Sequence, residues 1–474
     1  MGTAALAAGT SQPWATASGK RDEWIRLRNW LVVWVVIANT GFASLWFIGA
    51  PPRYPEILAA GLIGLVLRHR PRWQQFVGFC GALAFSVLHL AAATFGLSIT
   101  SVLHSFKFLV ELNPAQSQEY GVVAAALAVS VVLAWHGLKR AAGFTDSRVV
   151  VAAMVALSSW AALDAWMTWD VRGHYMREPT AGALFSSATG RSGLDAPTGA
   201  TRNVMVVMVE SLGLPANNPE MERLLFARYR SPEVAARFEL SRGETTYYNS
   251  TTAGEIRELC GRWGDYYDLL DRKDEGCLPA RLRAQGFETS AYHSFTGGFF
   301  DRTTWYPNIG FDNLVFGPDL AALGAQDCGG VFAGVCDRDV PRLLASRLKQ
   351  AERPQFVYWL TVNTHLPVAP RNNLDADACE RISPRLAADY PMICRQFAIW
   401  DSIDAALVRE ITAADFPPTD ILLVGDHIPP YFDRHSRSQF VPDKVPWLLL
   451  RWKGGADVPS HPIAAGAPRR PKEA

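Results

Sequence analysis

The sequence predicts an α/β fold in two parts: an N-terminal bundle of five transmembrane helices, then a domain with a mostly parallel sheet flanked by helices. The first observation is charge. Residues 1–170 carry 12 Lys/Arg and 8 Asp/Glu, about 12% of the segment, whereas the rest of the chain carries 71 charged side chains, about 23%. The second is that apolar runs alternate with helical patterns after residue 200. The net charge of +1 gives no reason to expect a nucleic-acid partner.

Five apolar stretches define the bundle, and they lie at 29–50, 54–67, 73–96, 120–138 and 149–169. A spanning helix needs about 20 apolar residues, so the second stretch is short. Charge nevertheless favours five spans, because ten Lys/Arg flank the stretches on one side and only Arg53 and Lys107 on the other. The bias predicts a cytoplasmic tail (1–24), a membrane domain (25–170) and an outer location for everything after Asp170. No cleavable signal sequence is expected at the N-terminus.

The outer part divides into a connector (171–200), a domain (201–455) and a flexible Pro/Ala/Gly-rich tail (456–474). Its strand candidates are nearly continuous in apolar residues, which is typical of strands buried on both faces; they lie at 203–210, 288–294, 356–363, 420–426 and 445–452. Helical patterns lie between them, at 219–230, 252–262, 279–285, 337–350 and 395–412.

Six of the seven cysteines follow residue 170, and Cys80 lies inside the third apolar stretch. An even number outside the membrane predicts disulfides in an oxidising compartment. Six cysteines allow 15 pairings. The simplest is three local pairs: Cys260–Cys277, Cys328–Cys336 and Cys379–Cys394.

Polar side chains follow several of the predicted strands. Glu210, His365 and the pair Asp426-His427 stand where strands end. Ligands of parallel α/β sheets bind at the carboxyl ends of the strands. A Glu, an Asp and a His at one such edge form a plausible donor set for a divalent metal that accepts oxygen and nitrogen ligands.

A candidate nucleophile precedes the helical pattern at 252–262. Thr252 and Glu255 fit a capping box, in which the threonine hydroxyl accepts from first-turn amides. That role for Thr252 leaves Thr251 free near the positive end of the helix, where a phosphate would bind. A threonine hydroxyl needs activation, for example by a metal, before it can attack.

Six segments in order resemble one family: "NVMVVMVES", "STTAGEIRELCG", "LPARLRAQGFETSAYHS", "TVNTHLP", "LLVGDHIPP" and "KVPWLLLR". The chain resembles the membrane-anchored phosphoglycerol and phosphoethanolamine transferases, such as lipoteichoic acid synthase, of the alkaline phosphatase/sulfatase superfamily. The similarity covers about 203–452. It implies a sulfatase-like domain. The predicted five-helix anchor also corresponds to the membrane anchor of this family.

The resemblance implies that Glu210, Thr251, Asp426 and His427 hold a divalent metal, Mn²⁺ or Zn²⁺, and that Thr251 becomes phosphorylated. Phosphoglycerol enzymes favour Thr251 as the nucleophile and phosphoethanolamine enzymes favour Thr252, so the assignment stays open between them. It also implies that His365, His293 and Arg302 bind substrate. His435, after "DHIPPYFDR", is a further substrate-side candidate as a second acid–base histidine, with a structural role as the alternative. An ion pair of Arg302 with Asp301 or Asp312 is the alternative for that arginine. Phe295 and Phe300 depart from the family pattern, which puts the head group in doubt.

The expected function is transfer of a phospholipid head group, with phosphoglycerol favoured, onto an envelope glycan or glycolipid. The expected location is a bacterial inner membrane, with the catalytic domain on the periplasmic or extracellular side. The alternatives are a phosphoethanolamine transferase, a sulfatase or phosphodiesterase, and a non-catalytic envelope scaffold.

The sulfatase alternative comes from Cys277 to Arg281, which match the C-x-P-x-R pattern of formylglycine formation. Thr251 lies 41 residues after Glu210, as the family spacing requires, whereas Cys277 lies 67 residues after it. Pro279 also suits the first turn of a helix. The match at Cys277 is therefore interpreted as a coincidence.

Overall fold

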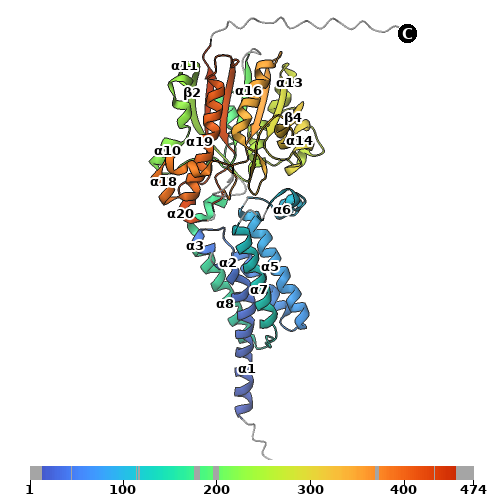
Figure 1. Ribbon diagram of the computed structural model, residues 1–474. Helices are drawn as coiled ribbons and strands as arrows, with labels where there is room; N and C mark the ends of the chain where they lie inside the picture. The colour runs from blue at the N-terminus through green and yellow to red at the C-terminus, as the bar shows by residue number, and fades with distance from the viewer. Residues whose placement is uncertain are drawn as a thin grey trace, which may run out of the picture.

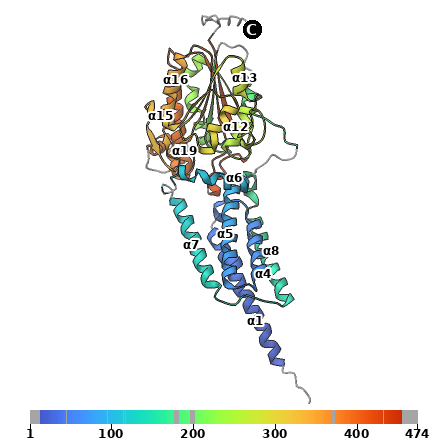
Figure 2. The same cartoon turned by 90° about the vertical axis from the view of Figure 1, so that its right-hand side faces the viewer.

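The computed structural model describes residues 13–43, 45–94, 96–113, 115, 118–175, 182–195, 202–368, 373–431 and 433–454. The predicted tail 456–474 lies outside these residues, as does part of the predicted connector. Two parts stack along one axis: a helical bundle and, beyond it, an α/β domain (Figure 1). The view turned by 90° shows the same stacking (Figure 2).

The bundle has helical structure at all five predicted stretches. Within the described residues, three helices are long and apolar enough to cross a membrane: α5 (Arg72–Thr94), residues Tyr120–Gly137 of α7 (Gln118–Gly137), and α8 (Ser147–Met167). The second stretch, α4 (Tyr54–Leu67), has only 14 residues. The first is divided among four elements: α1 (Pro13–Leu31), the π-helical η1 (Val32–Ile37), α2 (Ala38–Ala43) and α3 (Leu45–Ile48). Five spans are thus only partly supported, and α1 begins within the predicted tail 1–24.

The bundle has its own core. Trp30, Trp34 and Phe79 are buried in it. Gly64 allows α4 to approach η1, because a Cβ at this position would lie 2.4 Å from the Trp34 ring. The core holds the short α4 between α5 and α8, against which it packs.

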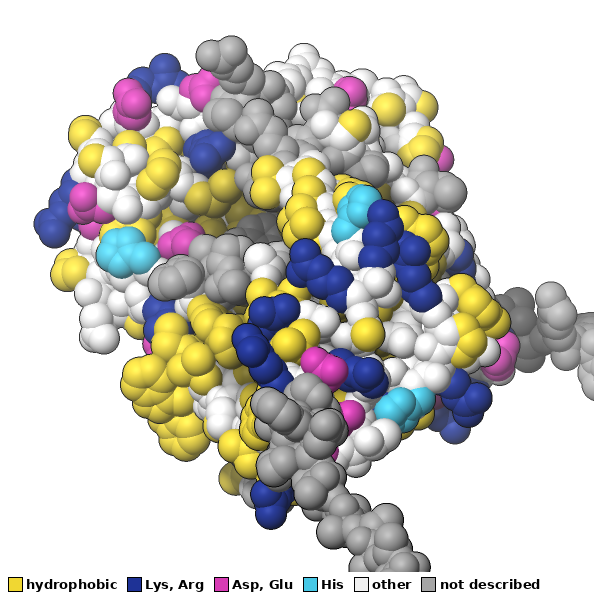
Figure 3. All heavy atoms as spheres, turned by 90° about the horizontal axis from the view of Figure 1, so that it is seen from below, with side chains coloured by type: hydrophobic (Ala, Val, Ile, Leu, Met, Phe, Trp, Pro, Cys, Tyr) yellow, Lys and Arg dark blue, Asp and Glu magenta, His cyan; other side chains and the backbone are white. Residues whose placement is uncertain are grey.

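Basic side chains gather at the end of the bundle farthest from the α/β domain (Figure 3). The loops after α4 and α7 meet there, since Arg68 donates to the Phe144 carbonyl at 3.1 Å and Arg26 to the Gly143 carbonyl at 3.0 Å. Arg70, Lys139, Arg140 and Arg148 are exposed at or beside these loops. The clustering is what the charge bias of the sequence predicts for a cytoplasmic face.

The α/β domain is built on a seven-stranded sheet with the order β2-β9-β8-β1-β7-β3-β4. The five predicted strands are confirmed as β1 (Asn203–Val209), β3 (Glu288–His293), β7 (Gln355–Leu360), β8 (Thr419–Gly425) and β9 (Lys444–Trp452). β1 pairs in parallel with β7 and β8, and β3 pairs in parallel with β7 and β4 (Asn313–Val315). β9 runs antiparallel to β8 and β2 (Phe238–Thr246). Two short strands, β5 (Asp327–Gly329) and β6 (Gly334–Val335), pair separately.

Alternate residues of β1 supply two cores, one on each face of the sheet. Met205, Val207 and Val209 pack toward α16 (Val340–Gln350) and α19 (Pro391–Ile411). Val204, Val206 and Met208 pack toward α12 (Thr251–Cys260), α13 (Leu278–Ala284) and α14 (Arg302–Asn308). The predicted helix at 219–230 is instead the short α10 (Pro219–Leu224) followed by η5 (Ala227–Arg230), with α11 (Pro232–Arg237) after them.

The three predicted local disulfides are confirmed as Cys260–Cys277, Cys328–Cys336 and Cys379–Cys394, and Cys80 is the unpaired cysteine. The first bond joins the end of α12 to the residue that caps α13. It thereby ties together two helices on one face of the sheet.

We expect replacement of both Cys260 and Cys277 by serine to destabilise the domain by about 2–4 kcal/mol, because the bond restricts a loop in the unfolded chain. Urea unfolding followed by tryptophan fluorescence measures the change, with Cys80→Ser as the control of small effect. Titration of the denatured, unreduced protein should find one thiol. Seven thiols, or a formylglycine mass at Cys277, would contradict the pairing.

The bundle and the domain meet along a seam crossed by charged contacts. Lys107 of η2 (Phe106–Glu111) donates to Asp301 at 2.7 Å, and His104 of α6 (Ile99–Ser105) contacts the same carboxylate at 3.0 Å. Arg434 of α20 (Arg434–Arg437) pairs with Asp170 at 3.0 Å. Figures 1 and 2 both place α6 between the two parts.

Candidate active site

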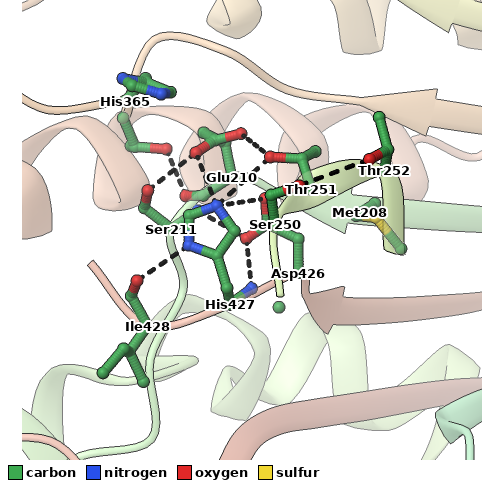
Figure 4. A network of polar contacts seen from close by, with 12 residues as sticks. Met208, Glu210, Ser211, Ser250, Thr251, Thr252, His365, Asp426, His427 and Ile428 are labelled. Atoms are coloured by element: carbon green, nitrogen blue, oxygen red, sulfur yellow. Dashed lines mark hydrogen bonds and ion pairs between the residues drawn. The ribbon is translucent and has the colours of Figure 1, made fainter. Parts of the chain in front are cut away.

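The candidate site lies where two neighbouring parallel strands end. Glu210 follows β1 and Asp426 follows β8, so their side chains meet at one edge of the sheet. Thr251 is the first residue of α12, whose axis starts at this edge. Figure 4 shows Glu210, Thr251, Asp426 and His427 pointing toward one another.

Short contacts join the four side chains. The Thr251 hydroxyl lies 3.3 Å from Glu210 Oε2 and 3.3 Å from His427 Nε2. His427 Nε2 lies 3.3 Å from Asp426 Oδ2 and 3.6 Å from Glu210 Oε1. One ligand atom from each of Glu210, Asp426 and His427 falls within 4.8 Å of the others, a spacing that one metal ion could bridge.

Backbone contacts hold the carboxylates in place. Asp426 Oδ1 accepts from the amides of Ser211, at 2.8 Å, and His427, at 2.6 Å. Ser211 has a φ of 56°, which turns the chain directly after Glu210. Gly254 lets α12 approach, because a Cβ there would lie 3.2 Å from Asp426 Cα. The edge is therefore preorganised around these groups.

The charges of the cluster are suited to a cation. Burial, with the negative charge of Glu210, raises the pKa of Asp426 to about 7. Burial alone would lower the pKa of His427, but Asp426 and Glu210 raise it above its ordinary value. Asp426 Oδ2 is buried, and within the described residues it makes no hydrogen bond beyond the ion-pair contact with His427 Nε2 at 3.3 Å. A divalent metal accepting carboxylate oxygen and imidazole nitrogen would satisfy that atom, so the residues fit such an ion.

The two threonines differ in what they face. The Thr252 hydroxyl lies 3.4 Å from that of Ser250 and interacts with Asp265, on the side away from the cluster (Figure 4). The predicted capping box is wrong: Ser250 is the N-cap, and the Glu255 carboxylate bonds elsewhere. A helix that starts one residue earlier turns Thr251 toward the cluster.

Arg302 and His293 are buried on the α12 side of the sheet, away from the cluster. Arg302 is 2% exposed and donates to Glu255 at 2.9 Å, so its partner is neither an open phosphate pocket nor Asp301 or Asp312. His293 ends β3 and contacts the Leu360 carbonyl at 3.0 Å. Burial, with the charge of Arg302, holds its pKa well below the ordinary value. Neither side chain makes a hydrogen bond or ion pair with Glu210, Asp426 or His427.

His365 and His435 have different surroundings. The His365 ring lies against Phe332, with 3.9 Å between centroids, and burial lowers its pKa to about 4. The hydroxyl of the preceding Thr364 donates to the Glu210 carbonyl at 2.6 Å, and Figure 4 shows His365 beside the cluster. His435 is exposed on α20 and stacks on Tyr390, with 4.5 Å between centroids. The structure thus brings His365 close to the site and leaves His435 at the surface.

Cys277 lies away from this edge. It is fully buried in its disulfide with Cys260, which is the last residue of α12. The rise of an α-helix separates Cys260 from Thr251 by about 14 Å. The sulfur is therefore bonded, and it stands at the opposite end of the helix from the cluster.

Sequence reasoning missed the buried residues that position α12. Arg257 donates to the carbonyls of Asp426, at 3.0 Å, and Gly425, at 2.7 Å. Glu255 accepts from Arg302 and from the hydroxyls of Tyr306 and Tyr358. The sequence feature that could have indicated these residues is the high density of charge in "GEIREL". An exposed helix would carry a similar density, so the feature is not specific.

The chain matches the model of a known protein family. The model of the family described as Sulfatase matches residues 202–455. A putative cyclic beta-1,2-glucan modification protein from Rhizobium meliloti (strain 1021) is 23% identical over 182 residues, which are 37% of this chain. The matched stretch spans 27% of that protein's length.

Solved structures also match. The lipooligosaccharide phosphoethanolamine transferase A (EptA) from Neisseria meningitidis is 12% identical with a TM-score of 0.44, over 90% of this chain and 88% of that one. The lipoteichoic acid synthase LtaP from Listeria monocytogenes is 16% identical with a TM-score of 0.39, over 55% of this chain and 67% of that one.

Proposed function

Because the chain belongs to the sulfatase family, we propose that it is a metal-dependent transferase of phospholipid head groups. It moves a phosphoryl group with its polar head, phosphoglycerol in preference to phosphoethanolamine, onto an envelope glycan or glycolipid. One observation carries the proposal: the Thr251 hydroxyl lies 3.3 Å from both Glu210 and His427, beside a membrane bundle. A nucleophile at Thr251 would lie close enough to the membrane bundle to attack the head group of a membrane phospholipid.

The reaction has two steps. Thr251 gives up its proton, its oxygen bonds the phosphorus of the phosphodiester, and the bond from phosphorus to the diacylglycerol oxygen breaks as that oxygen takes up a proton. An acceptor hydroxyl then bonds the same phosphorus and loses its proton, and the bond from Thr251 to phosphorus breaks, restoring the threonine. Two steps through a covalent phosphothreonine replace one difficult step.

Glu210, Asp426, His427 and Thr251 would hold the metal, Mn²⁺ or Zn²⁺. The ion supplies Lewis-acid stabilisation of charge on the phosphoryl oxygens. The chain's own residues orient the reaction: Asp426 is fixed by two backbone amides, and Arg257 ties its carbonyl to α12. The putative glucan-modifying relative favours a glycan acceptor.

The hydrolase and scaffold alternatives have less support. A sulfatase would need Cys277 free for oxidation, and its sulfur is bonded to Cys260. A water acceptor would make the chain a phosphodiesterase, but the membrane bundle beside the site favours a lipid donor. A scaffold would not need the Thr251, Glu210 and His427 contacts.

The proposed topology has five spans, with a cytoplasmic N-terminus and an outer catalytic domain in a bacterial inner membrane. We expect alkaline phosphatase fused after Asp170 to be active, because the Lys/Arg bias orients the bundle. A fusion after Arg70 is the control and should be inactive. An inactive fusion after Asp170 would contradict the orientation.

The function is tested with purified full-length protein, Mn²⁺ or Zn²⁺, and fluorescent phosphatidylglycerol or phosphatidylethanolamine. Release of fluorescent diacylglycerol, with a phosphorylated peptide containing Thr251, is the expected result. Faster release from phosphatidylglycerol would support the preferred head group, and the reverse would favour phosphoethanolamine. No release from either lipid, together with hydrolysis of a sulfate ester, would refute the proposal.

A further inference from the structure

A cavity lies at the seam between the membrane bundle and the catalytic domain, directly beside the candidate site. His427 and Ser250 form part of its wall, and His174 and Tyr175 of η4 (Trp169–Tyr175) form another part. Its volume of about 40 Å³ is room for roughly three water molecules. The cavity therefore joins segments that lie far apart in the sequence.

The seam is closely packed at this cavity. Gly96 follows α5 with a φ of 66°, and a Cβ there would lie 2.9 Å from Asn249 Cα. Asn249 stands two residues before Thr251. On the other side, the Tyr175 hydroxyl donates to the Gly49 carbonyl at 2.8 Å. The bundle is thus held against the loop that carries the nucleophile.

Arg437 supplies a buried positive charge to the cavity. It is 3% exposed, and its guanidinium lies 4.3 Å from the centre of the Tyr175 ring. Its Nε and Nη2 donate to the Tyr431 carbonyl. Among the described residues no carboxylate lies within ion-pair distance of it. A buried cation without a counter-ion is unfavourable, so this position is suited to an anionic ligand.

His174 adds an unused polar group. Both of its ring nitrogens are buried, and neither makes a hydrogen bond within the described residues, although the Val171 and Arg437 backbones lie close. Burial, with the charge of Arg437, holds its pKa below the ordinary value. A neutral imidazole offers one N–H donor, and Asn249 and Ser250 also line the cavity.

We propose that Arg437 and His174 form a phosphate-binding subsite at the seam, which holds the phosphodiester of the lipid donor next to Thr251. The subsite rests on the proposed function for its ligand. Its two principal residues are separate from the four candidate metal ligands. Because Thr94 and Gly96 of the membrane bundle also line the cavity, the phosphodiester would arrive with its acyl chains on the bilayer side.

Binding without turnover tests the subsite. Full-length protein carrying Thr251→Ala is stripped of metal and titrated with dihexanoyl phosphatidylglycerol or with inorganic phosphate, by calorimetry. We expect Arg437→Gln to weaken lipid binding about tenfold or more, since it removes a charge-assisted donor. His174→Ala should weaken it about threefold to tenfold. Arg434→Gln is the matched control: it lies on the same helix, pairs with Asp170 and should bind as the parent does.

The two probes separate the sources of the phosphate group. If both the lipid and inorganic phosphate bind, and both bind more weakly to the variants, the subsite recognises the phosphate group alone. If only the lipid binds, and it binds more weakly to the variants, the subsite recognises the phosphodiester of the donor. Either result supports the proposal. Unchanged binding of both probes in His174→Ala would overturn it, even if Arg437→Gln does not fold. If the lipid binds through the subsite but the metal-loaded protein with Thr251 intact transfers no head group, the proposed function is refuted and the subsite is still supported.

Discussion

We expect Thr251→Ala to abolish the proposed head-group transfer, lowering turnover by about 10⁴-fold or more, as removal of a nucleophile does in other covalent enzymes. The fold should stay intact, because the hydroxyl lies at the start of α12 and its hydrogen-bond contacts within the described residues are with Glu210 and His427. Release of diacylglycerol from fluorescent phosphatidylglycerol measures the loss. The midpoint of thermal unfolding reports on the fold.

Thr252→Ala is the matched control for this prediction. Its hydroxyl faces Ser250 and Asp265, so the substitution should leave most of the turnover. A phosphorylated peptide should carry its label on Thr251. Label on Thr252 would show that the neighbouring threonine is the nucleophile, and full turnover in Thr251→Ala would exclude a covalent phosphothreonine at this position.

Removing a candidate ligand should abolish metal binding and, with it, catalysis. Glu210→Gln, Asp426→Asn and His427→Ala each remove one donor from a set that lies within 4.8 Å, so we expect metal content well below one ion per chain. Turnover should fall more than about 100-fold. This loss is larger than the one expected when only a hydrogen-bond partner of a metal ligand is replaced. Elemental analysis after dialysis measures metal content. His435→Ala, which changes an exposed histidine, is the control and should retain the metal.

Metal affinity should also fall on acidification. Without metal, the pKa of Asp426 is about 7, so the proton and the ion compete for the same oxygens. Binding should therefore release a proton and weaken as the pH drops below 7. The contribution of Asp426 to the stability of the metal-free protein has the opposite dependence: its folded pKa is raised, so this contribution is fully present in acid and is lost as the pH rises through about 7. Metal affinity that does not change between pH 5 and 8 would argue against these ligands.

The sequence predicted the sheet well because its central strands are apolar on both faces. Phe356, Val357 and Tyr358 of β7 are all buried, and such runs cannot lie at a surface. β2 was missed because it is an edge strand, and its sequence "FELSRGETT" carries charged residues on an exposed face. Patterns that depend on burial predict buried strands, and an edge strand carries little of that signal.

Local sequence patterns and family resemblance predicted part of the candidate site. Glu210 and the Asp426-His427 pair follow strands, so strand prediction located them. Local reasoning about Thr252 and Glu255 failed, because Glu255 is bound by Arg302 from a helix 47 residues away. Such a tertiary bond outweighs a capping preference. The contact of Gly96 with Asn249 has no local signal at all, since it joins separate parts of the chain.

That contact has a consequence for biosynthesis. Gly96 leaves the ribosome long before Asn249, so the bundle can insert while the catalytic domain is still being made. Domains generally fold in order of synthesis. The outer end of α5 would then already be in place when the loop before Thr251 folds against it. A catalytic domain expressed alone would have to form that loop without its neighbour, and activity would become a readout of whether membrane insertion preceded folding.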